Sequence, residues 1–283
     1  MPAPRAVIEV AAIRKSYGAT VAVDEVSFEV REGEIFGLIG PNGAGKTTTM
    51  ECVEGVRRPD SGVISVLGLH PVRDVYKLQE RVGVQLQEAQ LQKRIKVREA
   101  VQLWASLYRR PLDGDRLLEQ LGLAEKRNAW FMTLSGGQKQ RLFIALALIN
   151  DPELVFLDEL TTGLDPQARH AIWTLVRGIR DRGKTVFLTT HLMEEAERLC
   201  DRIAIVDHGR MLALGTRDEL LATHGGPSEL VVLRNGSALR EAVQDPLARL
   251  NQLAAEGPID EFRLERPRLE QVFLHLTGRS LRD

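Results

Sequence analysis

The chain has 283 residues, of which 43% are hydrophobic, and this is enough for one large domain with a small appendage. Its formal net charge of −1 excludes the global basic field typical of nucleic-acid-binding proteins, so we expect no nucleic-acid partner. No uninterrupted apolar stretch approaches the roughly 18 to 20 residues that span a bilayer, no secretory signal is recognisable, and the two cysteines form no metal-binding pattern.

The first half of the chain combines predicted strands with a long helical region. Apolar alternation predicts strands over residues 7–13, 21–30 and 35–39. A helical pattern follows over residues 47–54, and a loop at 58–62 precedes another predicted strand at 63–67. Residues 97–148 are mostly helical in period, including 97–108 and 115–121.

The second half alternates strands and helices. From residue 154 the pattern predicts a strand, a helix at 166–182, a strand at 185–189, a helix at 192–199 and a strand at 202–207. This alternation predicts an α/β fold with a mostly parallel sheet covered by helices, interrupted by a helical insertion. After a linker at about 222–228, we expect a small α+β domain at 229–283, with strands at 229–233 and 259–264 and helices at 238–255 and 268–276.

A phosphate loop occupies residues 40–47, which fit the pattern G-x-x-x-x-G-K-[ST] between a predicted strand and a predicted helix. The glycines let backbone N–H groups surround a phosphate at a helix N-terminus. Lys46 is expected to reach the β- and γ-phosphates of ATP, and the Thr47 hydroxyl to bind Mg²⁺. The predicted nucleotide-binding residues of this segment are Gly40, Pro41, Asn42, Gly43, Ala44, Gly45, Lys46, Thr47 and Thr48.

Two carboxylates follow an apolar strand about 110 residues later. Residues 154–157 are Leu-Val-Phe-Leu, and Asp158 and Glu159 come directly after them. Asp158 is expected to hold Mg²⁺, directly or through water. Glu159 is placed one residue further on, where it can act as general base toward the attacking water.

The segment Leu-Ser-Gly-Gly-Gln at residues 134–138 matches the signature motif of ATP-binding cassette (ABC) ATPases. The chain resembles this family over about residues 6–220, with the motifs in the family's order. The resemblance implies a P-loop NTPase (RecA-like) core, an antiparallel β subdomain and a helical signature subdomain at about 88–152. Together they would form an ATPase domain over residues 6–221.

In that family two ATPase subunits pair head to tail, and the signature of one closes over the ATP held by the other. The residues fit such a role, because Ser135 and two glycines precede a predicted helix and so form a second anion site. An ordinary helix N-cap at Ser135 is the alternative for this segment alone. The resemblance therefore implies a homodimer, with residues that act on the partner's nucleotide: Ser135, Gly136, Gly137, Gln138 and Asp165.

Other positions match the family one by one. Gln87 resembles the glutamine that contacts Mg²⁺ and the attacking water, with Gln85 as a competing candidate, and His191 resembles the histidine that holds the γ-phosphate and orients Glu159. Tyr17 resembles the aromatic residue that stacks on adenine. The resemblance thus implies a catalytic set of Glu159, His191 and Gln87 and a metal set of Thr47, Gln87 and Asp158. One departure is Leu160, where relatives usually have proline.

The resemblance also implies partners and a location. An ABC ATPase of this kind works on integral membrane permease subunits, at the cytoplasmic face of the cell membrane. Residues 87–97 lie where such a permease docks, although a solvated loop is an equal alternative. The C-terminal part resembles a shortened accessory domain of type-2 exporter subunits, which strengthens or regulates dimerisation or simply covers the sheet. A soluble ABC protein acting in DNA repair or translation is the alternative function.

Overall fold

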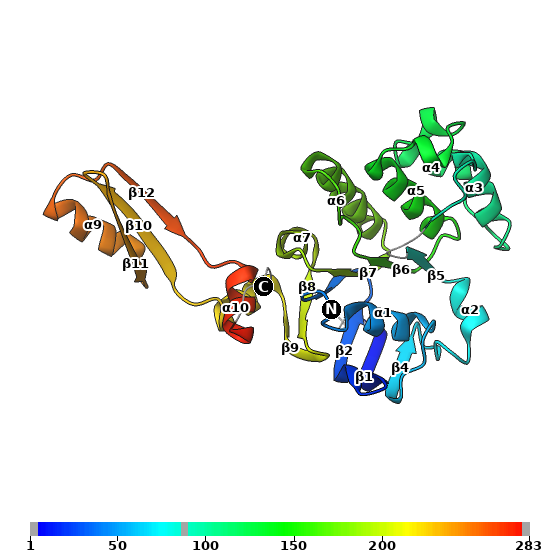
Figure 1. Ribbon diagram of the computed structural model, residues 1–283, viewed down its shortest axis with the longest axis horizontal. Coiled ribbons are helices and arrows are strands. Elements are labelled where there is room, and N and C mark those ends of the chain that lie inside the picture. The colour runs from blue at the N-terminus through cyan, green and yellow to red at the C-terminus, as the bar shows by residue number, and fades with distance from the viewer. Residues whose placement is uncertain (1–4, 86–89, 279–283) are drawn as a thin grey trace. The chain divides into compact units, whose positions relative to one another are not determined.

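The computed structural model describes residues 5–85 and 90–278, which divide into two compact units, Met1–Leu214 and Gly215–Asp283. The first unit is built around a six-stranded sheet (Figure 1). In spatial order, its strands are β5 (Val82–Gln85), β6 (Leu154–Asp158), β7 (Thr185–Thr190), β3 (Ile35–Ile39), β8 (Arg202–Asp207) and β9 (Arg210–Gly215). The pairs β5–β6, β6–β7, β7–β3 and β3–β8 are parallel. The predicted α/β fold with a mostly parallel sheet is therefore confirmed.

The strand order brings three predicted motifs to one edge of the sheet. β6, β7 and β3 are neighbours, and Asp158 at the end of β6 is paired with Thr189 near the end of β7. Parallel strands end at the same edge, so the segments that follow these three strands lie close together. They contain the phosphate loop, Glu159 and His191.

Side chains alternate between the two faces of this sheet, and each face has its own core. In β6, Leu154 and Phe156 join one core, whereas Val155 and Leu157 join the other. All four residues are fully buried. The continuous apolar run that precedes Asp158 is therefore explained by a strand covered on both faces.

One core joins the central sheet to an antiparallel sheet through helix α1 (Lys46–Glu54). This second sheet has the order β2 (Thr20–Arg31), β1 (Ala6–Tyr17) and β4 (Ser61–Val66). Phe28 of β2 stacks on Phe36 of β3 with the ring centroids 5.3 Å apart. Met50 of α1 is buried in the same core. This packing holds the helix that carries Lys46 against the sheet, and the expected antiparallel β subdomain is present.

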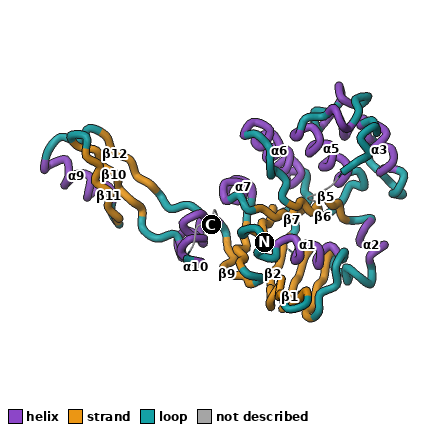
Figure 2. The backbone as a smooth tube through the Cα atoms, viewed as in Figure 1, coloured by secondary structure: helices purple, strands orange, loops and turns teal. Residues whose placement is uncertain are grey.

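The other core is shared with the helical insertion between β5 and β6 (Figure 2). From residue 90 onward, the insertion contains α3 (Val97–Ala105), α4 (Gly114–Gln120), α5 (Gly136–Leu148) and two short 3₁₀ turns, Ala124–Lys126 and Phe131–Thr133. α6 (Pro166–Asp181) and α7 (Met193–Leu199) contribute to the same core. α3 ends before the predicted position, residue 108. Among the described residues, no helix is both long enough and apolar enough to cross a membrane.

In its described residues, 215–278, the second unit contains a three-stranded antiparallel sheet and three helices. The strand order is β11 (Ser237–Val243), β10 (Ser228–Arg234) and β12 (Glu261–Glu265), and α9 (Pro246–Glu256) packs on β10. α8 (Arg217–His224) packs against α10 (Leu269–Thr277). α8 therefore belongs to this unit, whereas the sequence prediction assigned residues up to 221 to the first domain and treated 222–228 as a linker. A capping box formed by Thr216 and Glu219 starts this helix.

One secondary-structure prediction in this unit is wrong. The sequence predicted a helix over residues 238–255, but the first part of this range belongs to β11, and α9 begins only at Pro246. Asn235 and Gly236 have φ angles of 49° and 75°. This is the backbone of a two-residue hairpin turn, which returns the chain as a strand. Asp245 then caps α9 with its side chain.

Candidate active site

The phosphate loop leaves β3 and enters α1 through two glycines that the backbone requires. Gly45, directly before the helix, has a φ of 95°, which favours glycine. A Cβ atom at Gly40 would lie 2.2 Å from the carbonyl oxygen of Val206, so no larger residue fits there. α1, all of whose residues are described, has no side-chain cap and no acidic residue in its first turn. Its first amide groups are therefore available to an anion. The other predicted nucleotide-binding residues lie in the same loop or in the first turn of α1: Pro41, Asn42, Gly43, Ala44 and Thr48.

Lys46 lies inside this loop and is only 4% exposed. Its Nζ donates hydrogen bonds to the carbonyl oxygens of Gly40 at 2.9 Å and Pro41 at 3.0 Å. The same atom is 3.5 Å from Oε1 of Glu159. Burial lowers the pKa of Lys46, and the negative charge of Glu159 opposes this effect. The loop thus curls around an ammonium group that faces a carboxylate.

Asp158 is held by hydroxyl groups from two neighbouring segments. Its Oδ1 accepts a hydrogen bond from Oγ1 of Thr189 on β7, and Thr47 of α1 also hydrogen-bonds to its side chain. Asp158 is buried, and burial raises the pKa of its carboxyl group, which the hydrogen bond from Thr189 opposes. The two residues predicted to bind Mg²⁺ from the phosphate loop and from β6 are therefore in contact.

Glu159 connects Lys46 to His191. Its Oε2 lies 3.5 Å from Nδ1 of His191, while its Oε1 faces Lys46. The backbone of Glu159 has a φ of 46°, which is uncommon for a residue other than glycine, and its N–H donates to the carbonyl oxygen of Thr189 at 3.1 Å. Leu160, which stands where the family usually has proline, is buried. With leucine at this position, the Glu159 carboxylate faces both Lys46 and His191.

The signature segment forms a capped helix start. The Ser135 hydroxyl accepts a hydrogen bond from the N–H of Gln138, and the Gln138 side chain accepts one from the N–H of Ser135. A Cβ atom at Gly137 would lie 3.1 Å from Cβ of Ala168, so this turn packs closely against the start of α6. In residues 5–85 and 90–278, no hydrogen bond or ion pair joins the signature residues to the phosphate loop. The structure thus brings Lys46 together with Asp158 and Glu159, and it separately brings the signature segment against α6.

Two further predicted residues, Asp165 and Tyr17, lie at the start of α6 and at the end of β1. The Asp165 side chain caps α6 by accepting a hydrogen bond from the N–H of Ala168 at 2.9 Å. Tyr17 is 42% exposed at the end of β1, and the guanidinium carbon of Arg57 lies 5.2 Å from its ring centroid. Lys15 lies near the same ring. Tyr17 therefore presents an accessible aromatic face with cations beside it.

Gln87 lies outside the described residues, so its role stays a prediction. The competing candidate, Gln85, is the last residue of β5 and is buried. It pairs with Leu157 in the sheet, next to Asp158.

Sequence reasoning missed Thr189 and a second buried group near the site. Thr189 contacts both Asp158 and Glu159, and it could have been found only by placing strands 154–158 and 185–190 side by side. Glu195 of α7 accepts hydrogen bonds on Oε1 from Thr161 at 2.8 Å and from the indole N–H of Trp173 at 2.9 Å. This group ties the segment after Glu159 to the helix after His191.

Comparisons with known sequences agree with these motifs. The family described as ABC transporter matches residues 23–162. Nod factor export ATP-binding protein I of Paraburkholderia xenovorans (strain LB400) is 41% identical, and the match covers 99% of this chain and 100% of that protein. The protein of the same name from Rhizobium johnstonii (strain DSM 114642 / LMG 32736 / 3841) is also 41% identical, over 97% of this chain and 96% of that protein.

Solved structures show the same fold. A structure described as the ATP binding subunit of an ABC transporter is 29% identical with a TM-score of 0.69, over 88% of this chain and 98% of that chain. cbiO1 from Clostridium perfringens, described as part of the ABC transporter complex cbiONQ, is 28% identical with a TM-score of 0.70, over 77% of this chain and 91% of that chain. Because a relative that is 41% identical is matched over its whole length, the chain belongs to the ABC transporter family and is one of its ATP-binding, ATP-hydrolysing subunits.

Proposed function

We propose that this chain powers export through a separate integral membrane permease, as a homodimer at the cytoplasmic face of the membrane. The observation that carries the proposal is the group formed by Lys46, Glu159 and His191, in a chain that resembles export ATP-binding proteins over its whole length. The named relatives act in Nod factor export. The proposed direction of transport rests on these relatives. The proposed hydrolysis of ATP rests on the contacts among Lys46, Glu159 and His191.

ATP would bind across the start of α1. Its phosphates meet the N-terminal amides of the helix and the ammonium of Lys46, which gives up its contacts with Gly40, Pro41 and Glu159. The adenine ring would stack on Tyr17, where stacking on an aromatic face contributes about 1–3 kcal/mol per base.

Thr47 and Asp158 fit a Mg²⁺ ion. They offer a hydroxyl and a carboxylate oxygen that already lie within hydrogen-bonding distance of each other, and Mg²⁺ prefers such oxygen ligands. When bound there, Mg²⁺ would neutralise charge on the phosphates. Thr189 holds the Asp158 carboxylate in place through its own hydrogen bond. We propose Gln87, outside the described residues, as a third member of this set.

Glu159 would act as the general base in hydrolysis. Phosphoryl transfer depends mainly on positioning and charge neutralisation, so the protein must orient one water molecule and accept its proton. The backbone of Glu159 is held by its hydrogen bond to Thr189, and its carboxylate lies beside His191. Once Lys46 turns to the γ-phosphate, Oε1 of Glu159 is released toward the water.

The signature would act on the nucleotide of a second subunit. Ser135, Gly136 and Gly137 start α5, a helix of 13 residues whose N-terminus favours an anion. The phosphate-binding site at Lys46 of one subunit would be completed by Ser135 of the other subunit. Asp165 would lie at the same interface between the two subunits. Hydrolysis would then require the dimer.

The permease would dock on the first unit near residues 87–97. Of the described part of this segment, Leu91 and Ile95 are half-buried against the helical core, so they anchor it. The intervening residues 92–94 are exposed.

Co-purification from membranes tests this function. Tagged chain is expressed in its native host, extracted in detergent with ATP, and its partners are identified by mass spectrometry. A multi-span membrane protein with a stoichiometry near one to one supports the proposal. Ribosomal proteins or DNA in its place would contradict it.

A further inference from the structure

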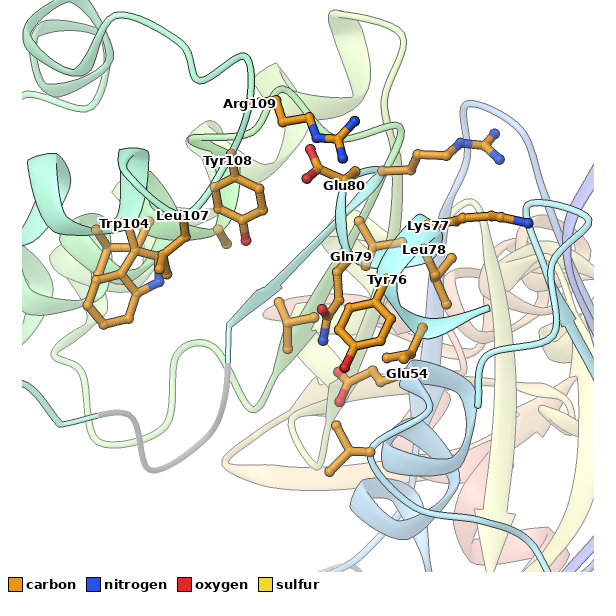
Figure 3. Close-up of a pocket in the computed structure, with 17 residues that line it drawn as sticks. Glu54, Tyr76, Lys77, Leu78, Gln79, Glu80, Trp104, Leu107, Tyr108 and Arg109 are labelled. Atoms are coloured by element: carbon orange, nitrogen blue, oxygen red, sulfur yellow. The ribbon is translucent and has the colours of Figure 1, made fainter. Parts of the chain in front are cut away.

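The helical insertion borders a pocket and also carries a separate basic surface. The pocket, with a volume of about 1130 Å³, lies between the end of α1, α2 (Val75–Gln79) and the insertion (Figure 3). Glu54 and Tyr76 lie on one side of it. The basic surface, which we call the basic ladder, consists of residues 93–98 and 126–132, and none of these residues lines the pocket. The two surfaces are therefore distinct.

Backbone hydrogen bonds hold the two segments of the basic ladder side by side. At one end, the N–H of Met132 donates to the carbonyl oxygen of Lys93 at 3.1 Å. At the other end, the N–H of Arg98 donates to the carbonyl oxygen of Arg127 at 2.9 Å. The two segments therefore form one continuous surface, although 27 residues separate them in the sequence.

One side of the basic ladder is buried and the other is accessible. Four of its residues join the core of the insertion: Ile95, Val97, Ala129 and Phe131. Lys96 and Trp130 alternate with them along the chain and are antiparallel partners. Nζ of Lys96 lies 5.1 Å from the ring centroid of Trp130, which is 42% exposed. Because side chains of an extended pair alternate between two faces, the buried residues anchor the ladder and leave this cation and this ring at the surface.

The basic ladder has a local excess of positive charge. It contains no acid and six cations: Lys93, Arg94, Lys96, Arg98, Lys126 and Arg127. None of these cations forms an ion pair with another described residue, whereas Arg81 pairs with Glu153 at 2.6 Å. The adjoining acids are Glu99 and Glu125, and Glu99 accepts the backbone N–H of Lys96 at 2.9 Å. This surface therefore attracts anions, although the whole chain has a net charge of −1.

Exposed apolar side chains lie among these cations. Met132 is 55% exposed, and Trp130 is exposed beside Lys96. Tryptophan is enriched at the boundary between lipid headgroups and acyl chains, where its ring contacts apolar groups and its N–H stays near water. Lysine and arginine beside it attract the anionic phospholipids of the cytoplasmic leaflet. The combination of unpaired cations with exposed Trp and Met side chains therefore matches the chemistry of a membrane surface.

We propose that the basic ladder binds the phosphate headgroups of anionic phospholipids. This inference rests on the proposed location at the cytoplasmic face of the membrane, and it adds a direct lipid contact to the proposed contact with the permease. Arg94, Lys96 and Arg98 pair with headgroup phosphates, while Trp130 and Met132 enter the boundary between headgroups and acyl chains. The buried side of the ladder transmits this contact to the core of the insertion.

Flotation of the complete chain with lipid vesicles tests this inference in the absence of any permease. Vesicles of phosphatidylcholine are compared with vesicles in which part of this lipid is replaced by phosphatidylglycerol. Binding is measured at low salt and at about 1 M salt, where the Debye length falls to about 3 Å. The variants are Arg98→Glu and Trp130→Ala, and thermal unfolding confirms that each is folded.

Two variants outside the basic ladder serve as matched controls. Arg116→Glu on α4 makes the same charge change as Arg98→Glu, at another exposed arginine of the insertion. Tyr76→Ala on α2 removes an aromatic side chain that is 84% exposed, as Trp130→Ala removes an exposed ring. These controls separate a local contact from a general effect of net charge or of surface hydrophobicity.

We expect wild type to bind vesicles that contain phosphatidylglycerol, to bind phosphatidylcholine vesicles far less, and to be released at high salt. One positive charge near an anionic surface strengthens binding about fivefold, so Arg98→Glu, which changes two charge units, should weaken it roughly 25-fold. Trp130→Ala should weaken binding several-fold and leave its salt dependence unchanged. Both controls should bind like wild type.

Other outcomes overturn the inference. These are equal binding to both kinds of vesicle, or an equal loss of binding in Arg98→Glu and Arg116→Glu. If wild type binds single-stranded RNA but no vesicles, and Arg98→Glu abolishes this binding, the basic ladder binds nucleic acid instead. If the permease co-purifies but wild type binds no vesicles, the lipid contact alone fails. If the vesicles bind as expected but no membrane protein co-purifies, the proposed function fails and the lipid contact stands.

Discussion

Oε1 of Glu159 lies 3.5 Å from Nζ of Lys46. Both side chains are nearly buried, with 7% of Glu159 and 4% of Lys46 exposed. Buried charges are costly unless they are paired, so each group stabilises the other in this position. A phosphate that binds Lys46 competes with Glu159 for the same ammonium. In the proposed mechanism, binding of ATP at Lys46 would therefore free the carboxylate of Glu159 to act as the general base.

Glu159→Gln should separate binding from hydrolysis. The amide cannot accept the proton of the attacking water, so we expect turnover to fall by roughly 10²- to 10⁴-fold. It also competes less well for Lys46, so ATP should bind at least as tightly as in wild type. Steady-state ATPase assays and equilibrium binding of ATP measure the two effects. Wild-type turnover in this variant would show that another residue is the base.

Thr189→Val should weaken the site without touching a proposed reacting group. The change removes the hydroxyl that donates to Asp158 and lies 3.2 Å from the N–H of Glu159. Asp158 keeps its hydrogen bond with Thr47, and the N–H of Glu159 keeps its bond to the carbonyl oxygen of Thr189, so we expect a loss of stability of about 1 kcal/mol. We expect lower stability in denaturant and an increased Mg²⁺ requirement for hydrolysis. Thr174→Val on α6, where the residue is exposed, is the control and should change neither.

Ser135→Ala should reduce both stability and turnover. Loss of an N-cap costs about 0.5–2 kcal/mol. Thr216→Ala removes an equivalent capping box in the second unit, so it controls for the stability effect. Only Ser135→Ala should lower ATPase activity at saturating ATP and equal folded fraction. If the two variants had equal ATPase activity, Ser135 would serve only as the N-cap of α5.

Glu54→Gln should change the pH dependence of stability. The carboxyl has a pKa raised from 4.5 to about 8 in the folded chain, so the native state holds a proton that the unfolded chain loses first. Wild-type stability should therefore fall as the pH rises from about 4.5 to 8. The free energy of unfolding is measured in denaturant at pH 5.5 and at pH 8.5. The difference between the variant and wild type should shift in favour of the variant by about 1–3 kcal/mol at the higher pH. Glu119→Gln, which makes the same change at an exposed acid of α4, should show no such gain.

Sequence reasoning located the strands and the loop of the candidate site where chemistry and local pattern coincide. The phosphate loop could be predicted because a buried strand, two required glycines and Lys46 occur within a few residues of each other. Asp158 and Glu159 followed from an apolar run that the sheet buries on both faces.

The failures concern relationships between distant segments or competing local signals. Thr189 reaches Asp158 only because β7 lies beside β6, and no local sequence pattern predicts which strands are neighbours. In the second unit, residues 238–242 have the composition of a helix, but the turn at Asn235 and Gly236 starts a strand. Glu54 lies within a predicted helix, and its burial depends on how the insertion packs.

Mixing two inactive variants tests the central claim that Ser135 acts on the nucleotide held by Lys46 of another subunit. Lys46→Ala removes the phosphate site, and Ser135→Arg blocks the signature. In a mixed head-to-tail dimer, one site combines the intact phosphate loop of one subunit with the intact signature of the other. We predict that each variant alone is inactive and that mixing them restores ATP hydrolysis in proportion to the mixed dimer. Mixtures that stay inactive although mixed dimers form would contradict the account.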